Sequence, residues 1–193
     1  MTSEQTPSSR ERPEPAECLY AFTVERVMTA APEGIYRAWT ERFDTWFASP
    51  GAIRMRPHVG EPYWFEVLQN GDHVPHYGRF IDLEPGRLIE QTWVTGTNGT
   101  DGAETVVRVE LVGTGSGTRL RLTHSGFYDA VAAQRHADSW LRILEHLDER
   151  LTDSDEQTGV PAIGKVGGAG GRCRWAVQRR SLRTPSRATR LTC

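Results

Sequence analysis

The sequence has little cysteine, a single lysine and no long apolar run. Its three cysteines are scattered and odd in number, which argues against a disulfide framework and gives no metal-ligand spacing; they are Cys18, Cys173 and Cys193. Because no stretch of about 18 apolar residues is present, no segment is expected to span a membrane. The first 17 residues are polar and acidic, unlike a secretory signal. Together these absences favour a cytoplasmic protein.

Motifs for catalysis and cofactor binding are also missing. The chain has no Gly-x-Ser-x-Gly sequence, and the GTGSG stretch at 113–117 lacks the following Lys-Ser/Thr of a phosphate-binding loop. His73 and His76 are three residues apart, but Pro75 lies between them and no third ligand is near, so a solvated turn is favoured over a metal site. We therefore expect no catalytic residue, no metal and no cofactor. A non-enzymatic protein is favoured, with an enzyme as an open alternative.

The small net charge of −2 conceals an uneven distribution. Residues 1–156 carry 15 Lys+Arg and 25 Asp+Glu, whereas residues 157–193 carry eight basic residues and no acidic one. The first part should repel nucleic acid, so no nucleic-acid partner is expected for it, and the final segment alone could attract polyanions.

Both ends of the chain lack the periodicity of a folded domain. Residues 1–17 contain prolines among charges and are expected to form a disordered leader. Residues 152–193 are rich in Gly, Arg, Ser and Thr and are expected to form a disordered basic tail. A nucleic-acid or membrane-surface arm is one alternative for this tail, and coding sequence translated out of frame is the hypothesis that we favour. The folded domain is placed at residues 18–151.

Between these ends, hydrophobic periodicity predicts a strand, two short helices, six further strands and a long helix. Asn70-Gly71 is a strong hairpin signal, and short links between consecutive strands favour an antiparallel sheet. We predict an α+β helix-grip fold, in which a curved antiparallel sheet of seven strands carries two short helices and has the long C-terminal helix over its concave face. The expected strands are 18–28, 53–57, 62–69, 75–84, 87–95, 104–112 and 118–124, and the helices begin near 32, 41 and 130, the last one ending at 151.

Several short motifs, taken in order, resemble a known family. They are TAAPEGIYRAWTERFDTWF at 29–47, GRF at 78–80, EPGRL at 84–88, the GTRL strand at 117–120 that runs on to His124, and Ser139-Trp140. The pattern is similar to the START/Bet v 1-like (SRPBCC) superfamily, particularly its activator of Hsp90 ATPase homologue 1-like (Aha1 C-terminal-like) branch, over about residues 20–151. Gly60-Glu61 and Ser139 depart from the Gly-Gly and Gly that are usual there. The resemblance implies the helix-grip fold, which hosts carriers, cyclases and co-chaperones alike.

Strand parity places two polar side chains on the apolar inner face. In TRLRLTH, His124 shares a face with Leu120 and Leu122, and Gln91 alternates with Trp93 in the same way. Such groups could orient a ligand on apolar walls, or they could be satisfied locally by hydrogen bonds. The tryptophans, likewise, could fill a core or line a cavity. The candidate ligand-cavity residues are Trp39, Trp46, Phe47, Phe65, Phe80, Gln91, Trp93, His124, Trp140 and Leu144.

Three functions follow as hypotheses. The favoured one is a non-enzymatic protein that binds a small hydrophobic molecule in a cavity between the sheet and the last helix. The resemblance implies the second, a co-chaperone that activates an Hsp90-type ATPase. The third, a cyclase or hydrolase using His124 in the same cavity, lacks a visible partner for the histidine. The outer surface of the last helix, which includes Glu145 and Asp148, is expected to be solvated, with an acidic partner-binding patch as the alternative.

Overall fold

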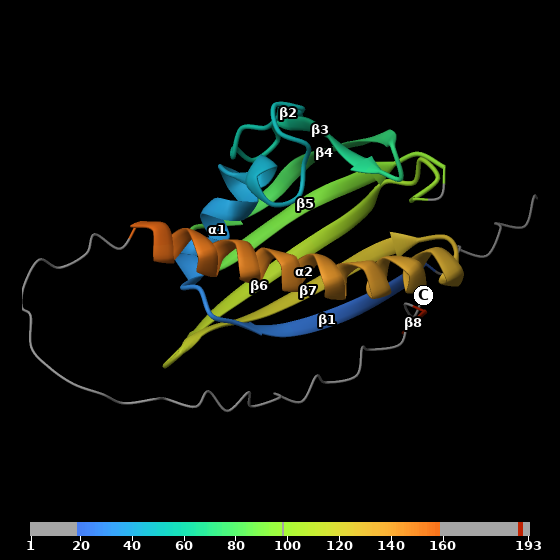
Figure 1. Ribbon diagram of the computed structural model, residues 1–193. Coiled ribbons are helices and arrows are strands. Elements are labelled where there is room, and N and C mark those ends of the chain that lie inside the picture. Colours follow the sequence, from blue (N-terminus) through green and yellow to red (C-terminus); the bar gives the residue numbers. More distant parts are fainter. Residues whose placement is uncertain (1–18, 98, 159–188, 191–193) are drawn as a thin grey trace, which may run out of the picture.

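The computed structural model describes residues 19–97, 99–158 and 189–190, and these form one antiparallel sheet with helices on one face (Figure 1). Helix α1 (Pro32–Thr40) and a 3-10 turn, η1 (Phe43–Thr45), follow the first strand, and the long helix α2 (Ala130–Thr158) follows the seventh. The strands are β1 (Tyr20–Met28), β2 (Ile53–Arg54), β3 (Pro62–Gln69), β4 (Asp72–Glu84), β5 (Leu88–Thr95), β6 (Thr105–Thr114), β7 (Gly117–Phe127) and β8 (Thr189–Arg190).

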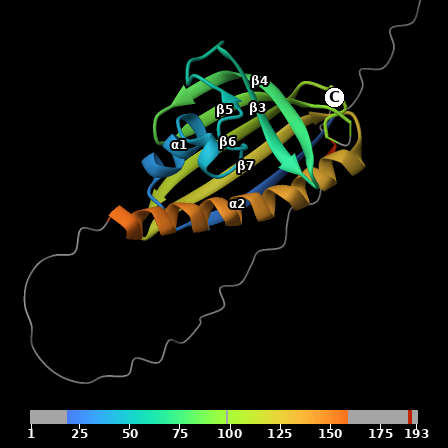
Figure 2. The same ribbon diagram turned by 45° about the horizontal axis from the view of Figure 1, so that its top comes forward.

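The strands form a meander with the first strand added at its end, and the long helix crosses one face of this sheet. The order is β2-β3-β4-β5-β6-β7-β1-β8, so β2 to β7 form a meander and β1 pairs with the last strand of that meander. Helix α2 leaves the end of β7 and runs along the sheet face, while α1 and η1 lie over its other end (Figures 1 and 2). The predicted helix-grip fold, with its seven antiparallel strands and long C-terminal helix, is confirmed. Strand β8 adds two residues at the edge of β1.

Two predicted helices differ in extent from those observed, β2 is shorter than the predicted strand, and β4 and β7 are longer. The second short helix is only the 3-10 turn η1, and α2 extends to Thr158 instead of ending at Leu151. The added residues, TDSDEQT, lack apolar periodicity, but extending an existing helix costs far less than starting one. This extension and β8 both fall within the segment expected to be a disordered tail. The rest of that tail and the leader at 1–17 lie outside the described residues.

Local chemistry fixes both the main hairpin and the start of α2. Asn70 and Gly71 have φ angles of 55° and 92°, as the predicted two-residue hairpin turn between β3 and β4 requires. Asp129 caps α2, because its carboxylate accepts hydrogen bonds from the backbone N–H groups of Ala132 (2.8 Å) and Val131 (3.2 Å). These two bonds also lower the pKa of Asp129.

The sheet face beneath α2 is built from rows of side chains that cross the strands. One row runs through Phe80, Gln91, Val107, His124 and Phe22, which are successive cross-strand partners in β4, β5, β6, β7 and β1. All five side chains are buried. Helix α2 covers this face with residues at helical spacing, and those that are buried include Ala133, Ala137, Trp140, Leu144 and Leu147.

Candidate functional site beneath the last helix

The fold brings together all ten residues proposed to line a cavity. Nine of them are buried, and Phe47 is half-buried. They come from α1, the η1 region, four strands and α2, so residues far apart in the sequence meet under the long helix.

These side chains pack against one another. The rings of Trp39 and Trp140 stack with centroids 5.6 Å apart, and the ring of Phe47 also stacks on that of Trp140, at 5.8 Å. Trp93 meets Trp140 edge-on at 5.5 Å. Aromatic pairs at these distances contribute roughly 0.5–1.5 kcal/mol each beyond their burial. The tryptophans therefore form an aromatic core in this structure.

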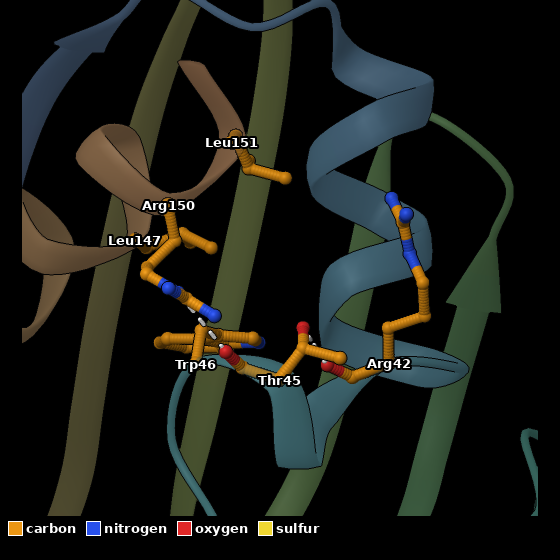
Figure 3. Close-up of a pocket in the computed structure, with 6 residues that line it drawn as sticks. All are labelled: Arg42, Thr45, Trp46, Leu147, Arg150 and Leu151. Atoms are coloured by element: carbon orange, nitrogen blue, oxygen red, sulfur yellow. Dashed lines mark hydrogen bonds between the residues drawn. The ribbon is translucent and has the colours of Figure 1, made fainter. Parts of the chain in front are cut away.

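Two hollows lie near the ends of α2. The smaller, of about 30 Å³, is lined by side chains from the C-terminal part of α2 and from the α1–η1 region (Figure 3). There Arg150 reaches the carbonyl oxygen of Thr45 at 3.3 Å, over the ring of Trp46. The larger, of about 420 Å³, is lined by the loop at 100–104 and by residues of the β7–α2 junction. Neither hollow is lined by Gln91 or His124.

His124 is held in a saturated chain of hydrogen bonds. Trp140 Nε1 donates to His124 Nδ1 at 3.2 Å, and His124 Nε2 lies 2.7 Å from Thr105 Oγ1. The threonine hydroxyl in turn donates to the carbonyl oxygen of Trp93 at 2.7 Å. Since an indole N–H can only donate, Nδ1 of His124 must accept. The proton of the imidazole must therefore be on Nε2, which donates to the threonine hydroxyl oxygen. The imidazole is therefore neutral, with both nitrogens engaged.

The surroundings of His124 reinforce this protonation state. Burial lowers its pKa well below the usual histidine value, and the nearby His136 lowers it further. The rings of His124 and His136 lie 5.3 Å apart. An imidazole in this state links α2 to β6 and β7, and it lacks the free nitrogen that the cyclase or hydrolase hypothesis would require.

Gln91 presents the opposite situation on the same face. Its side chain is 0% exposed, and neither Oε1 nor Nε2 has a hydrogen-bond partner. The indole N–H of Trp39 is also buried without a partner, whereas that of Trp46 donates to the carbonyl oxygen of Ala38 at 2.9 Å. A buried polar group left unpaired costs about 1–3 kcal/mol, so Gln91 is the residue in this core whose presence packing does not explain.

The two closely spaced histidines lie in strand β4, and the expected solvated turn is wrong for them. His73 pairs with Glu66 at 2.9 Å on the exposed side, but His76 is buried against the ring of Phe65 at 4.7 Å. Burial lowers the pKa of His76 to about 4, although its contact with the Val74 carbonyl acts in the opposite direction. Within the described residues, no cluster of His, Cys, Asp and Glu could hold a metal ion.

A second polar connection holds the far part of α2 against β1. Asp148 accepts hydrogen bonds from the backbone N–H and the hydroxyl of Thr29, both at 2.8 Å. Arg26 lies 3.8 Å from Asp148 and 3.8 Å from Glu145. The expectation that Glu145 and Asp148 belong to a solvated helix face is therefore wrong for Asp148, whose side chain is only 15% exposed.

The site contains residues that the sequence analysis missed. His76 and Phe43 are buried among the aromatic rings, and His136 contacts both His124 and Phe127. The signal for His136 was available, because it precedes Trp140 by four residues and therefore shares its helix face.

Solved structures from several bacteria share this fold. A protein from Mesorhizobium loti is 24% identical with a TM-score of 0.59, and the match covers 70% of this chain and 98% of that one. The solution structure of the Aha1 dimer from Colwellia psychrerythraea is 21% identical with a TM-score of 0.52, covering 68% and 95%. A Rhodobacter sphaeroides protein is 26% identical with a TM-score of 0.57, covering 69% and 93%.

Sequence comparisons give the family. No curated protein sequence matches the chain, and no helix in the described ranges is long and apolar enough to cross a membrane. The family model described as "Activator of Hsp90 ATPase homolog 1-like protein" matches residues 29–152, which is more than half of the sequence. The geometry of the sheet and of α2, together with this match, shows that the chain belongs to the Activator of Hsp90 ATPase homolog 1-like family.

Proposed function

We propose that the protein binds a small hydrophobic molecule between the sheet and α2 and does not catalyse its conversion. The observation that supports this function is the buried, unpartnered amide of Gln91 on an otherwise apolar and aromatic face. Binding pockets typically combine apolar walls with a few convergent polar groups. A ligand that met this amide would remove the cost of leaving it unpaired.

Entry of the ligand requires a rearrangement, because aromatic rings fill the interior in this structure. The hollow of about 420 Å³ at the β7–α2 junction offers an approach, since its walls include the buried residues Phe127 and Ala132. The ring of Phe127 lies 4.5 Å from that of His124. Movement of the N-terminal part of α2 would therefore open the core from this side.

Native mass spectrometry tests the proposal after the protein is incubated with an apolar extract of the cells that make it. We expect a species heavier than the free protein by the mass of one small molecule. In a parallel NMR titration, the indole N–H signal of Trp39 should move, because this group lacks a partner in the free protein. The Trp46 indole, bonded to Ala38, is the internal control. Recovery of free protein only, with an unmoved Trp39 signal, would contradict the proposal.

A second candidate function is activation of an Hsp90-type chaperone ATPase. This activity would take place in the cytoplasm, where the sequence led us to expect the protein. The filled interior favours a function performed by the surface, and the family is described by this activity. Tyr128 and Val131, at the β7–α2 junction, are exposed apolar side chains of the kind that partners contact.

An ATPase assay with the Hsp90 homologue of the same cells separates the two candidates. Stimulation by the wild-type protein that is lost in the Tyr128→Ser, Val131→Ser double variant would support this function. No stimulation at a large molar excess would exclude it.

A further inference from the structure

We infer the chemical class of the ligand, which rests on the proposed function: an uncharged molecule with a flat apolar body and an amide-like pair of one hydrogen-bond donor and one acceptor. The pair would bind the side-chain amide of Gln91, with the ligand acceptor meeting Nε2–H and the ligand donor meeting Oε1. The evidence is the distribution of satisfied and unsatisfied polar groups beneath α2.

Most polar groups under the helix are already occupied. Both ring nitrogens of His124 are bonded, and the hydroxyl of Tyr63 donates to the carbonyl oxygen of Thr92 at 2.6 Å. In the described part of the chain, the buried side-chain atoms without a partner belong to Gln91, Trp39 and Arg26. Arg26 faces Glu145 and Asp148 at the edge of α2, which leaves Gln91 and Trp39 in the aromatic core. Gln91 alone offers both a donor and an acceptor.

The lack of buried charge determines the charge of the ligand. The buried polar side chains of the described residues are threonine, histidine and glutamine, with no Asp, Glu, Lys or Arg among them. A carboxylate or ammonium group at Gln91 would lose its hydration without gaining an opposite charge, which is far more costly than burying a neutral amide. Fatty-acid anions and amines are therefore disfavoured, and neutral molecules are favoured.

The neighbours of Gln91 determine the shape of the ligand body. Phe80 is its cross-strand partner in β4, and Trp93 lies two residues along β5 on the same face. Trp93 also contacts Trp140 of α2, so aromatic rings flank the amide along and across the sheet. Flat rings favour a planar partner of similar width.

Three naphthalene probes of similar size test this inference by isothermal titration calorimetry at pH 7.5. They are 2-naphthamide, which carries a donor and an acceptor; 2-ethylnaphthalene, which carries neither; and 2-naphthoate, which is charged. If each of the two hydrogen bonds contributes about 1 kcal/mol net, the wild-type protein should bind the amide about 30-fold more tightly than the hydrocarbon. The naphthoate should bind at least about 100-fold more weakly than the amide.

The variant Gln91→Met keeps the side-chain length and removes the amide. It should bind 2-naphthamide no more tightly than 2-ethylnaphthalene, while keeping its affinity for the hydrocarbon. The matched control is Thr92→Val, the next residue on β5, whose hydroxyl accepts from the backbone N–H of Arg79 on the opposite side of the strand. It should keep the wild-type preference.

The outcomes separate the two proposals. A preference for the amide that survives in Gln91→Met, or tightest binding of the naphthoate, would overturn this inference and leave the proposed function standing. Equal binding of the amide and the hydrocarbon by the wild type would do the same. Failure of all three probes to bind would overturn this inference, because they share its flat apolar body, whereas the proposed function is overturned by recovery of free protein only in the native mass spectrometry experiment.

Discussion

The sheet face beneath α2 has two polar regions that differ in one respect. Gln91 in β5 and His124 in β7 both pair with Val107 of the strand between them, and both are 0% exposed. His124 is saturated by Trp140 and Thr105, whereas Gln91 has no side-chain partner. Burial alone therefore does not reveal the role of a polar residue. A saturated group holds the fold together, and an unsaturated one weakens the free protein and remains available for binding.

The largest effect on the free energy of unfolding is expected when the contact between Trp140 and His124 is removed. Trp140→Ala removes a fully packed indole and leaves Nδ1 of His124 without its donor. The free energy of unfolding should fall by about 3–5 kcal/mol, measured by urea denaturation monitored by circular dichroism. A loss below about 1 kcal/mol would show that α2 does not depend on this contact.

Acid should weaken the histidine region and leave the Gln91 region unchanged. Burial lowers the pKa of His76 to about 4 and lowers those of His124 and His136. Because the unfolded chain takes up these protons first, stability is complete above the unfolded pKa of about 6.5 and declines as the pH falls toward 4. His76 alone accounts for about 3 kcal/mol of this decline.

Thermal unfolding between pH 7.5 and pH 4 measures this dependence. The variant His76→Phe should reduce the decline, while Tyr77→Phe, at the exposed neighbouring position, should leave it unchanged. A flat profile in the wild-type protein would contradict the burial of these imidazoles.

A smaller loss is expected when one acceptor in the His124 chain is removed. Thr105→Val keeps the volume of the side chain but leaves Nε2–H of His124 unpaired. We expect the free energy of unfolding to fall by about 1–3 kcal/mol in equilibrium denaturation. An unchanged value would mean that water or another group satisfies the imidazole.

A substitution that removes the polar group of Gln91 should stabilise the protein, in contrast to the substitutions around His124. Gln91→Met removes two unpaired polar atoms from the core and should raise the free energy of unfolding by about 1 kcal/mol. The same denaturation experiment applies, with Thr92→Val as the neighbouring control, which should not be stabilised. Destabilisation by Gln91→Met would show that the amide has a structural partner and would remove the contrast with His124.

The sequence indicated the strands and the inward side chains because alternation and turn chemistry act locally. Parity placed His124 and Gln91 on the apolar face, and Asn70-Gly71 placed the hairpin. Their hydrogen-bond status could not be read in the same way, since Thr105 and Trp140 reach His124 from other elements through cross-strand register and helix packing. His76 was missed because the pair of histidines was interpreted as a solvated turn, although β4 begins at Asp72 and runs through both of them.

The pairing of β1 with β7 has a consequence for the order of folding. Thr23 and Thr123 are 100 residues apart in the chain, yet their hydroxyls are hydrogen-bonded at 3.0 Å. Hairpins among β2 to β7 close short loops, whereas β1 must wait on the ribosome until β7 has emerged. Its apolar side chains stay uncovered for most of synthesis, so β1 is the segment through which slow translation or a weakened β7 would lead to aggregation.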